Sequence, residues 1–214
     1  MENLVIVFAK NPELGKCKTR LARSIGDEKA LEIYKELIQH TATTISKVSA
    51  SRAVFYSEEI QTQDLWDDAL FQKHLQSQGH LGQKMQAAFE WGFAKGYSKI
   101  CIVGSDLFEL SASDLDNAFQ ELEVNDMVFG PANDGGYYLM GMTRFYEKAF
   151  LEKAWSTETV LEKTLNDLKG LSIAFLETKT DIDTVEDLAK HPEFHKYIPN
   201  SILKKLTSTH KTRM

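Results

Sequence analysis

The chain lacks the features that mark membrane, disulfide-linked and nucleic-acid-binding proteins. None of its apolar runs approaches the roughly 20 residues that a membrane-spanning helix requires. Its two cysteines, Cys17 and Cys101, lie far apart and in no metal-ligand spacing, which favours a reducing compartment. Acidic residues outnumber basic ones, 31 to 25, and the net charge of −6 argues against general binding of nucleic acid.

The first residues enter a strand-like run without a basic segment or a cleavage site, so we expect no signal peptide and a cytoplasmic protein. The last residues, 204–214, are locally basic, and we expect a solvated helical tail there rather than a binding arm. The chain has 214 residues, 43% of them hydrophobic, which is enough for one large domain. We expect that domain to span residues 1–214, with its core at about 4–190.

Short apolar runs alternate with longer amphipathic ones. We expect strands at residues 4–9, 53–56, 100–103, 127–129, 137–142 and 171–176, and helices at 28–48, 81–97, 113–122 and 159–168. This alternation is typical of parallel β-α-β units, so an α/β sandwich is the expected fold. In open α/β sheets, ligands bind beyond the carboxyl ends of the strands, so the loops that follow strands are the first places to search for a site.

The loop after the first strand is rich in cations. Lys10, Lys16, Lys18 and Arg20 lie on it or in the first turn of the helix that we expect to follow, and Gly15 stands among them. Cations at a helix N-terminus oppose the helix dipole, so this arrangement favours an anionic ligand, such as a phosphate chain. The spacing does not match a P-loop. A solvated basic loop is the alternative interpretation.

Two carboxylates occupy comparable loop positions later in the chain. Asp106 comes directly after the strand at 100–103, and Asp183 lies just before the last helical stretch. Mg²⁺ and Mn²⁺ take carboxylate oxygens and usually bridge to substrate phosphates, so the two residues are candidate metal ligands. Each also has a local interpretation: Asp106 could cap the turn that follows it, and Asp183 with Glu186 has the spacing of a capping box.

Residues 129–141, FGPANDGGYYLMG, hold a lone carboxylate and paired glycines between two apolar runs. Gly135 and Gly136 allow positive φ and let a ligand approach the backbone closely. Asp134 beside them therefore indicates a binding site. The alternative is a simple β-hairpin, because Asp-Gly is a strong hairpin signal.

In order and spacing, five segments together resemble the DUF2064 group of proposed glycosyltransferases, the arsenosugar-biosynthesis type. They are residues 8–21, 104–106, 130–141, 155–157 and 181–188, which read FAKNPELGKCKTRL, GSD, GPANDGGYYLMG, WST and DIDTVEDL. This group is similar to the wider GT-A superfamily of nucleotide-diphospho-sugar transferases, which also includes nucleotidylyltransferases. The resemblance implies a three-layer α/β/α sandwich with a mixed, mostly parallel central sheet.

The resemblance also implies roles for individual residues. It implies catalytic roles for Asp106 and Asp134, and a divalent Mg²⁺ or Mn²⁺ on Asp106 and Asp183. The residues that would bind the nucleotide and its phosphates are Ala9, Lys10, Gly15, Lys18, Arg20, Gly82 and Ser105. The residues that would border a small-molecule acceptor are Gly135, Gly136, Tyr137 and Trp155.

Two positions depart from the family pattern. Phe108 stands where the family usually has proline, and His80 stands where it usually has aspartate, which implies altered substrate choice or weaker activity. Three functions remain open: sugar transfer from a nucleotide-diphospho-sugar, nucleotidyl transfer from a nucleoside triphosphate to a phosphorylated small molecule, and nucleotide binding without turnover. The residues alone do not separate the first two, and the resemblance favours sugar transfer.

Overall fold

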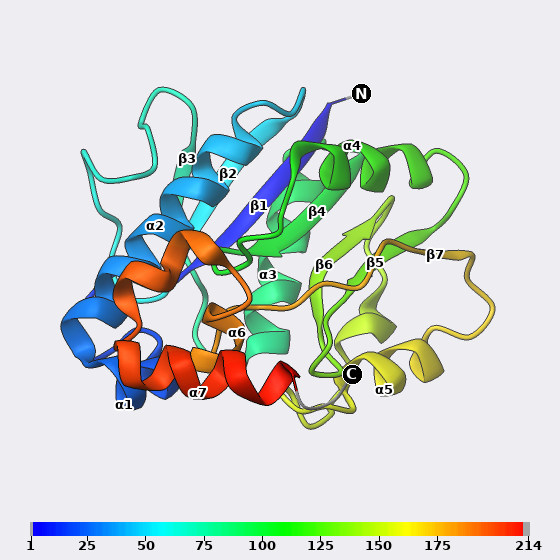
Figure 1. Ribbon diagram of the computed structural model, residues 1–214. Helices are drawn as coiled ribbons and strands as arrows, with labels where there is room; N and C mark the ends of the chain where they lie inside the picture. The colour runs from blue at the N-terminus through cyan, green and yellow to red at the C-terminus, as the bar shows by residue number, and fades with distance from the viewer. Residues whose placement is uncertain (1, 212–214) are drawn as a thin grey trace.

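The structure is a computed structural model that describes residues 2–211, and one sheet organises them (Figure 1). The strands are β1 (Asn3–Ala9), β2 (Ser51–Tyr56), β3 (Gln72–Leu75), β4 (Lys99–Gly104), β5 (Met127–Pro131), β6 (Tyr137–Met142) and β7 (Ile173–Phe175). The α-helices are α1 (Thr19–Ile25), α2 (Asp27–Ile45), α3 (Leu81–Ala94), α4 (Ala112–Glu121), α5 (Val160–Asp167), α6 (Val185–Leu188) and α7 (Asn200–Lys211). Two 3₁₀ helices are η1 (Glu147–Phe150) and η2 (Pro192–Tyr197).

The seven strands lie in the order β3-β2-β1-β4-β6-β5-β7. The pairs β1–β2, β1–β4, β2–β3 and β5–β7 are parallel, whereas β6 runs antiparallel to both β4 and β5. The predicted α/β fold with a mixed, mostly parallel sheet is therefore confirmed.

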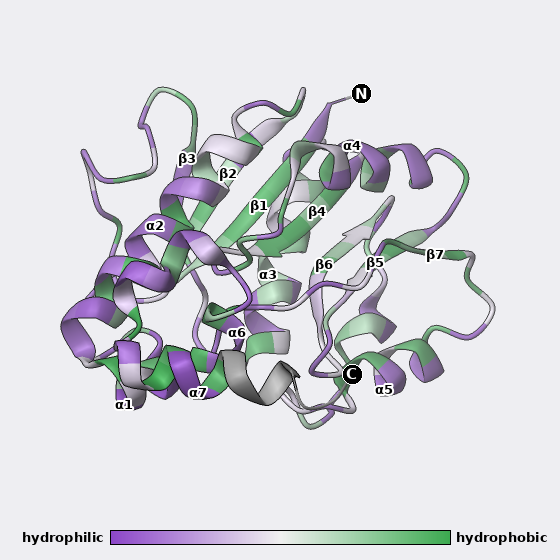
Figure 2. Ribbon diagram, viewed as in Figure 1, coloured by the Kyte–Doolittle hydropathy of each residue, from purple (hydrophilic) through white to green (hydrophobic). Residues whose placement is uncertain are grey.

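The central strands consist largely of hydrophobic residues (Figure 2), and their side chains pack in core clusters on both faces of the sheet. Successive residues of a strand point to opposite faces. Val7 packs in one core cluster with Ile38 of α2 and Leu115 of α4, while its neighbour Ile6 packs in another with Phe89 of α3. The sheet is thus the middle of three layers, with α2 and α4 on one face and α3 on the other.

A third apolar cluster packs helices near the N-terminus against segments near the C-terminus. Leu21 of α1 and Leu37 of α2 pack there with Val185 of α6 and Phe194 of η2. This packing brings the segment just before α6 against the loop that follows β1. Residues 212–214 of the predicted basic tail lie outside the described residues. No helix between residues 2 and 211 is long and apolar enough to cross a membrane.

Most predicted elements are present, with differences at their ends. The predicted helices at 28–48 and 81–97 end earlier, as α2 at Ile45 and α3 at Ala94. The residues after α3 turn away at Gly96, which has a φ of 89°. β3 was not predicted, because its four residues, QKHL, have no buried apolar member. The 3₁₀ helices were not predicted either.

The connection between β5 and β6 is a hairpin, so that interpretation of residues 129–141 is correct. The amide of Gly135 donates to the carbonyl of Ala132 at 3.1 Å, and Oδ1 of Asp134 accepts from the amide of Gly136 at 2.9 Å. Gly135 has a φ of 85°, and a Cβ there would collide with the carbonyl of Glu158. A glycine is therefore required for the shape of the turn itself.

Candidate functional site

The carboxyl ends of β1 and β4 meet at one edge of the sheet. The two strands are parallel neighbours, with Phe8 paired to Gly104, so the loops that follow them lie together. A cavity of about 390 Å³, here called the first cavity, opens at this edge. Seven of the predicted site residues line it: Ala9, Lys10, Lys18, Arg20, Ser105, Asp106 and Asp183.

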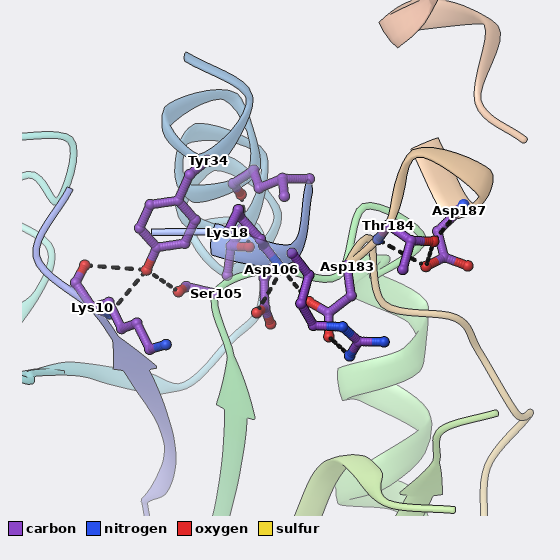
Figure 3. A network of polar contacts seen from close by, with 11 residues as sticks. Lys10, Lys18, Tyr34, Ser105, Asp106, Asp183, Thr184 and Asp187 are labelled. Carbon is purple, nitrogen blue, oxygen red and sulfur yellow. Dashed lines mark hydrogen bonds and ion pairs between the residues drawn. The ribbon is translucent and has the colours of Figure 1, made fainter. Parts of the chain in front are cut away.

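Lys18 joins the two carboxylates (Figure 3). Its ammonium nitrogen lies 2.9 Å from Oδ2 of Asp106 and 3.0 Å from Oδ1 of Asp183. Only 4% of the Lys18 side chain is exposed, against 40% of Asp106 and 41% of Asp183. Arg20 donates to the second oxygen of Asp183 at 3.2 Å, from a side chain that is mostly exposed. The cations predicted to hold phosphate thus contact the carboxylates predicted to hold a metal.

These contacts shift the pKa values of Lys18 and Asp106. Burial alone would lower the pKa of the Lys18 ammonium, but the charges of Asp106 and Asp183 outweigh it and raise that pKa. Burial alone would raise the pKa of the Asp106 carboxyl, but the Lys18 ammonium reverses this and lowers it. The lysine is therefore held charged and the aspartate ionised, which is the state needed to bind phosphate and a metal ion.

The backbone of Lys18 is in a conformation that L-residues rarely adopt. Its φ and ψ are 47° and 43°, in the left-handed region, at the residue that precedes α1. Such a conformation costs about 1–3 kcal/mol and persists only where the surrounding structure enforces it. Here the turn accompanies a buried side chain that bridges two carboxylates, so the strain lies at the candidate site.

Tyr34 of α2 ties the two strand-end loops together. Its hydroxyl accepts from the amide of Lys10 at 2.9 Å and lies 3.1 Å from the carbonyl of the same residue. It also lies 3.0 Å from the hydroxyl of Ser105 (Figure 3). Burial raises the pKa of this phenol, so it remains a neutral hydrogen-bonding group. Through these hydrogen bonds Tyr34 holds Lys10 and Ser105 together, and all three residues line the first cavity.

The expected capping box of Asp183 with Glu186 is wrong by one residue. The residue that caps α6 is Thr184, whose hydroxyl accepts from the amide of Asp187, while the Asp187 carboxylate accepts from the amide of Thr184. Thr184 has an extended backbone and a hydroxyl, as a cap requires. Asp183 is thereby free of the helix and contacts Lys18 and Arg20 instead.

A second cavity, of about 300 Å³, adjoins the first one and shares Arg20 and Asp183 with it. Asp134 of the hairpin turn lines it, together with Asp181. Burial, followed by the negative charge of Asp106, raises the pKa of the Asp181 carboxyl to about 7. The two cavities are thus neighbours, with Arg20 and Asp183 lining both.

The remaining predicted residues lie outside the linings of both cavities. They are Gly15, Gly82, Gly135, Gly136, Tyr137 and Trp155. Gly82 nevertheless lies in the first turn of α3 with Leu81 and Lys84, which do line the first cavity. A Cβ on Gly82 would collide with the indole ring of Trp155, so the two residues are in close contact.

The two departures from the family pattern have structural roles. His80 is the N-cap of α3 in a capping box with Gln83, and its ring stacks on Trp155 at 5.9 Å between centroids. Phe108 does not line either cavity, and it packs in an aromatic group with Phe194, whose ring centroid is 4.8 Å away.

Eight lining residues of the first cavity were not predicted as site residues. Four of them are polar and lie outside the loop after β1: Tyr34, Ser57, Gln76 and Lys84. Tyr34 lies at helical spacing with apolar neighbours and therefore resembled a core residue. Gln76 follows β3, the strand that the sequence did not reveal, and its amide donates to the carbonyl of Phe55 at 2.9 Å. The position of each residue became recognisable only from the fold.

A metal ion at this site would have two protein ligands. Across residues 2–211, no group of three or more His, Cys, Asp or Glu side chains is placed to hold an ion. Mg²⁺ usually takes one or two carboxylates together with water and substrate phosphates. The oxygens of Asp106 and Asp183, both within 3.0 Å of one ammonium nitrogen, fit such a substrate-completed site.

Solved structures with the same fold include proteins that are named as transferases. A protein from Desulfovibrio desulfuricans G20, provisionally named a nucleotide-diphospho-sugar transferase, matches with a TM-score of 0.82 and 28% identity, over 88% of this chain and 86% of that one. A cytidylyltransferase from Leptospira borgpetersenii matches with a TM-score of 0.60 and 12% identity, over 100% and 95%. The inositol-1-phosphate CTP transferase from T. maritima matches with a TM-score of 0.54 and 16% identity, over 95% of each chain. The fold is therefore that of the nucleotide-diphospho-sugar transferases.

Comparison with curated proteins gives no match. A family profile, described as an uncharacterized protein conserved in bacteria (DUF2064), matches residues 40–157. That match spans more than half of the 214-residue chain and agrees with the resemblance seen in the sequence. The protein therefore belongs to the DUF2064 family.

Proposed function

We propose that this protein is a glycosyltransferase that uses a nucleotide-diphospho-sugar donor and Mg²⁺ or Mn²⁺ to glycosylate a small-molecule acceptor. The observation that carries the proposal is the lining of the first cavity, where the cations Lys10, Lys18 and Arg20 meet the carboxylates Asp106 and Asp183. A diphosphate with a divalent ion needs both kinds of group. The cavity volume of about 390 Å³ lies in the ordinary range for small-ligand sites.

In the proposed reaction, Lys10, Lys18 and Arg20 bind the diphosphate, and Asp106 and Asp183 are the residues that would hold the metal ion. An acceptor hydroxyl attacks the anomeric carbon, the bond from that carbon to the diphosphate oxygen breaks, and the nucleoside diphosphate leaves. Fixed positive groups beside the leaving oxygens stabilise the charge that develops there. A bound divalent ion would add Lewis-acid stabilisation of the same charge.

Asp134 is the proposed base if the reaction inverts the anomeric centre. It lines the second cavity, and its side chain is exposed. Since Oδ1 accepts from the amide of Gly136, the hairpin turn fixes the orientation of the carboxylate. The acceptor hydroxyl would transfer its proton to Asp134 as the new bond forms.

The nearest alternative is nucleotidyl transfer, in which a phosphorylated substrate attacks the α-phosphorus of a nucleoside triphosphate and pyrophosphate leaves. One observation favours it: a fourth cation, Lys84, lines the first cavity with Lys10, Lys18 and Arg20, which suits the larger charge of a triphosphate. We prefer sugar transfer because the Desulfovibrio protein matches with a TM-score of 0.82, against 0.60 for the cytidylyltransferase.

An assay of product release distinguishes the two transfer reactions from nucleotide binding without turnover. The protein is incubated with UDP- and GDP-sugars and Mn²⁺, and release of the nucleoside diphosphate is measured. A parallel assay with CTP or GTP and phosphorylated small molecules measures pyrophosphate. Metal-dependent release from a nucleotide-sugar that Asp106→Asn abolishes supports the proposal. Pyrophosphate release alone supports nucleotidyl transfer, and nucleotide binding with neither product supports a non-catalytic protein.

A further inference from the structure

The charge of the second cavity bears on which acceptor the protein can take. This cavity adjoins the first one through Arg20 and Asp183, so a molecule bound in it lies beside the proposed donor. It is lined by residues from three separate parts of the chain: Arg20 of α1, the β5–β6 turn, and the segment from Thr180 to Lys190 that includes α6. The cavity is therefore available to the second substrate of the transfer.

Carboxylates dominate its lining. Four of the lining side chains are acidic, Asp134, Asp181, Asp183 and Asp187, and two are basic, Arg20 and Lys190. Net negative charge of this kind raises the local concentration of cations and repels anions.

Both basic side chains are already paired. Arg20 donates to Asp183 at 3.2 Å, and Lys190 donates to Asp187 at 3.1 Å. Asp134, by contrast, contacts only the amide of Gly136 among the described residues, so its charge is not neutralised by a cation. An anion entering the second cavity would therefore meet carboxylates and no unpaired cation from its described lining.

The two candidate reactions make opposite demands on this cavity. In nucleotidyl transfer the attacking group is a phosphate, which carries about 1.5 to 2 negative charges at neutral pH and would need cations to approach the donor. In sugar transfer the attacking group is a neutral hydroxyl, for which a nearby carboxylate serves as a base. The lining suits a hydroxyl and opposes a phosphate.

We infer that the acceptor is a hydroxyl compound that carries no phosphate or other anionic group, and that it binds in the second cavity. This inference rests on the proposed function, since it places the acceptor beside the donor of a sugar transfer. The carboxylates accept hydrogen bonds from the acceptor hydroxyls, and Asp134 lies among them. The same charge excludes phosphorylated compounds, including the substrates that nucleotidyl transfer would require.

The test uses matched pairs of small molecules that differ only in a phosphate: glycerol and glycerol 3-phosphate, myo-inositol and inositol 1-phosphate, glucose and glucose 6-phosphate. Binding of each to the full chain is measured by saturation-transfer NMR, with UDP or GDP and Mn²⁺ bound. The neutral member of a pair should bind about tenfold more tightly or better, a difference of about 1.4 kcal/mol. Tighter binding of the phosphorylated members, or binding of neither member, overturns the inference.

A charge-neutralising variant makes the test more specific. Asp134→Asn keeps the oxygen that accepts from Gly136 and removes the charge. It should reduce the preference for the neutral member several-fold, whereas Asp116→Asn, at an exposed position on α4, should leave it unchanged. An unchanged preference in Asp134→Asn contradicts the inference.

The nucleoside diphosphate provides a separate readout for the proposed function. If UDP or GDP binds with Mn²⁺ but the phosphorylated compounds are preferred, the acceptor inference fails alone. If no nucleotide binds, the proposed function fails and the inference fails with it.

Discussion

The ammonium nitrogen of Lys18 lies 2.9 Å from Oδ2 of Asp106, although the two residues are 88 positions apart in the chain. The contact links the turn before α1 to the end of β4. Because a second carboxylate, from Asp183, lies 3.0 Å from the same nitrogen, one ammonium group bridges both aspartates. Under the proposed function the same two aspartates would hold a metal ion, so Lys18 and the ion would compete for them.

Lys18→Met should weaken binding of a nucleoside diphosphate by about tenfold or more, since hydrogen bonds to charged groups contribute about 1.5–3 kcal/mol. The same change should strengthen binding of Mn²⁺ in the absence of nucleotide, because the competing ammonium is gone. Calorimetric titration measures the first effect, and electron paramagnetic resonance of free Mn²⁺ measures the second.

Lys16→Met is the matched control. Lys16 lies on the same loop, its side chain is 63% exposed, and it pairs with Glu13 rather than with the site carboxylates. It should change both affinities little. Equal effects of the two substitutions would mean that the loop acts only through its overall charge.

Asp106→Asn should lower the affinity for Mn²⁺ in the presence of nucleoside diphosphate by at least about tenfold, which corresponds to about 1.4 kcal/mol. The amide is a weaker ligand and cannot carry the negative charge that a hard cation prefers. Asp183→Asn should behave in the same way, and Asp116→Asn should not. Retained Mn²⁺ affinity in both site variants would remove these residues from the metal site.

The sequence was sufficient to predict which loops carry the candidate site residues, but not which of these residues contact one another. Lys18, Asp106 and Asp183 were recognisable because charged residues directly follow apolar strands or precede a helix. Their pairing was not, since it depends on the left-handed backbone of Lys18 and on the apolar cluster that brings α6 to α1. The expected phosphate and metal ligands therefore proved to be one ion-paired group.

Some elements and contacts of the fold could not be predicted from the sequence pattern. β3 is a short, polar strand at the edge of the sheet, so neither burial nor alternation marks it. Tyr34 has the spacing of a core residue, and only the fold shows that its hydroxyl reaches Lys10 and Ser105. By contrast, β1 and β4 were predictable because both are almost wholly apolar and buried, as expected for central parallel strands.

Gly82→Ala should destabilise the protein by about 1–3 kcal/mol, because the added methyl would collide with the ring of Trp155. A double-mutant cycle with Trp155→Ala tests this cause. In that background Gly82→Ala should be nearly neutral, as measured by urea unfolding. An undiminished loss in the Trp155→Ala background would show that the glycine is needed for another reason.

Gly135→Ala should destabilise more than Gly170→Ala. Both glycines have positive φ, 85° and 96°, so both substitutions carry backbone strain of about 1–2 kcal/mol. Only at Gly135 would the Cβ also collide with a backbone carbonyl, that of Glu158. Urea unfolding of the two variants isolates the collision, and equal losses would argue against the close packing of the hairpin turn on residue 158.

The most direct test of the central proposal is a thermal-shift panel of nucleoside diphosphates, nucleotide-sugars and nucleoside triphosphates, each with and without Mn²⁺. A ligand at about 100 times its Kd should stabilise the folded protein by roughly 2.7 kcal/mol. We expect a metal-dependent shift with a nucleotide-sugar and its diphosphate, and loss of that shift in Lys18→Met. A shift with CTP or GTP alone, or no shift with any nucleotide, would contradict the assignment of the first cavity to a nucleotide-diphospho-sugar.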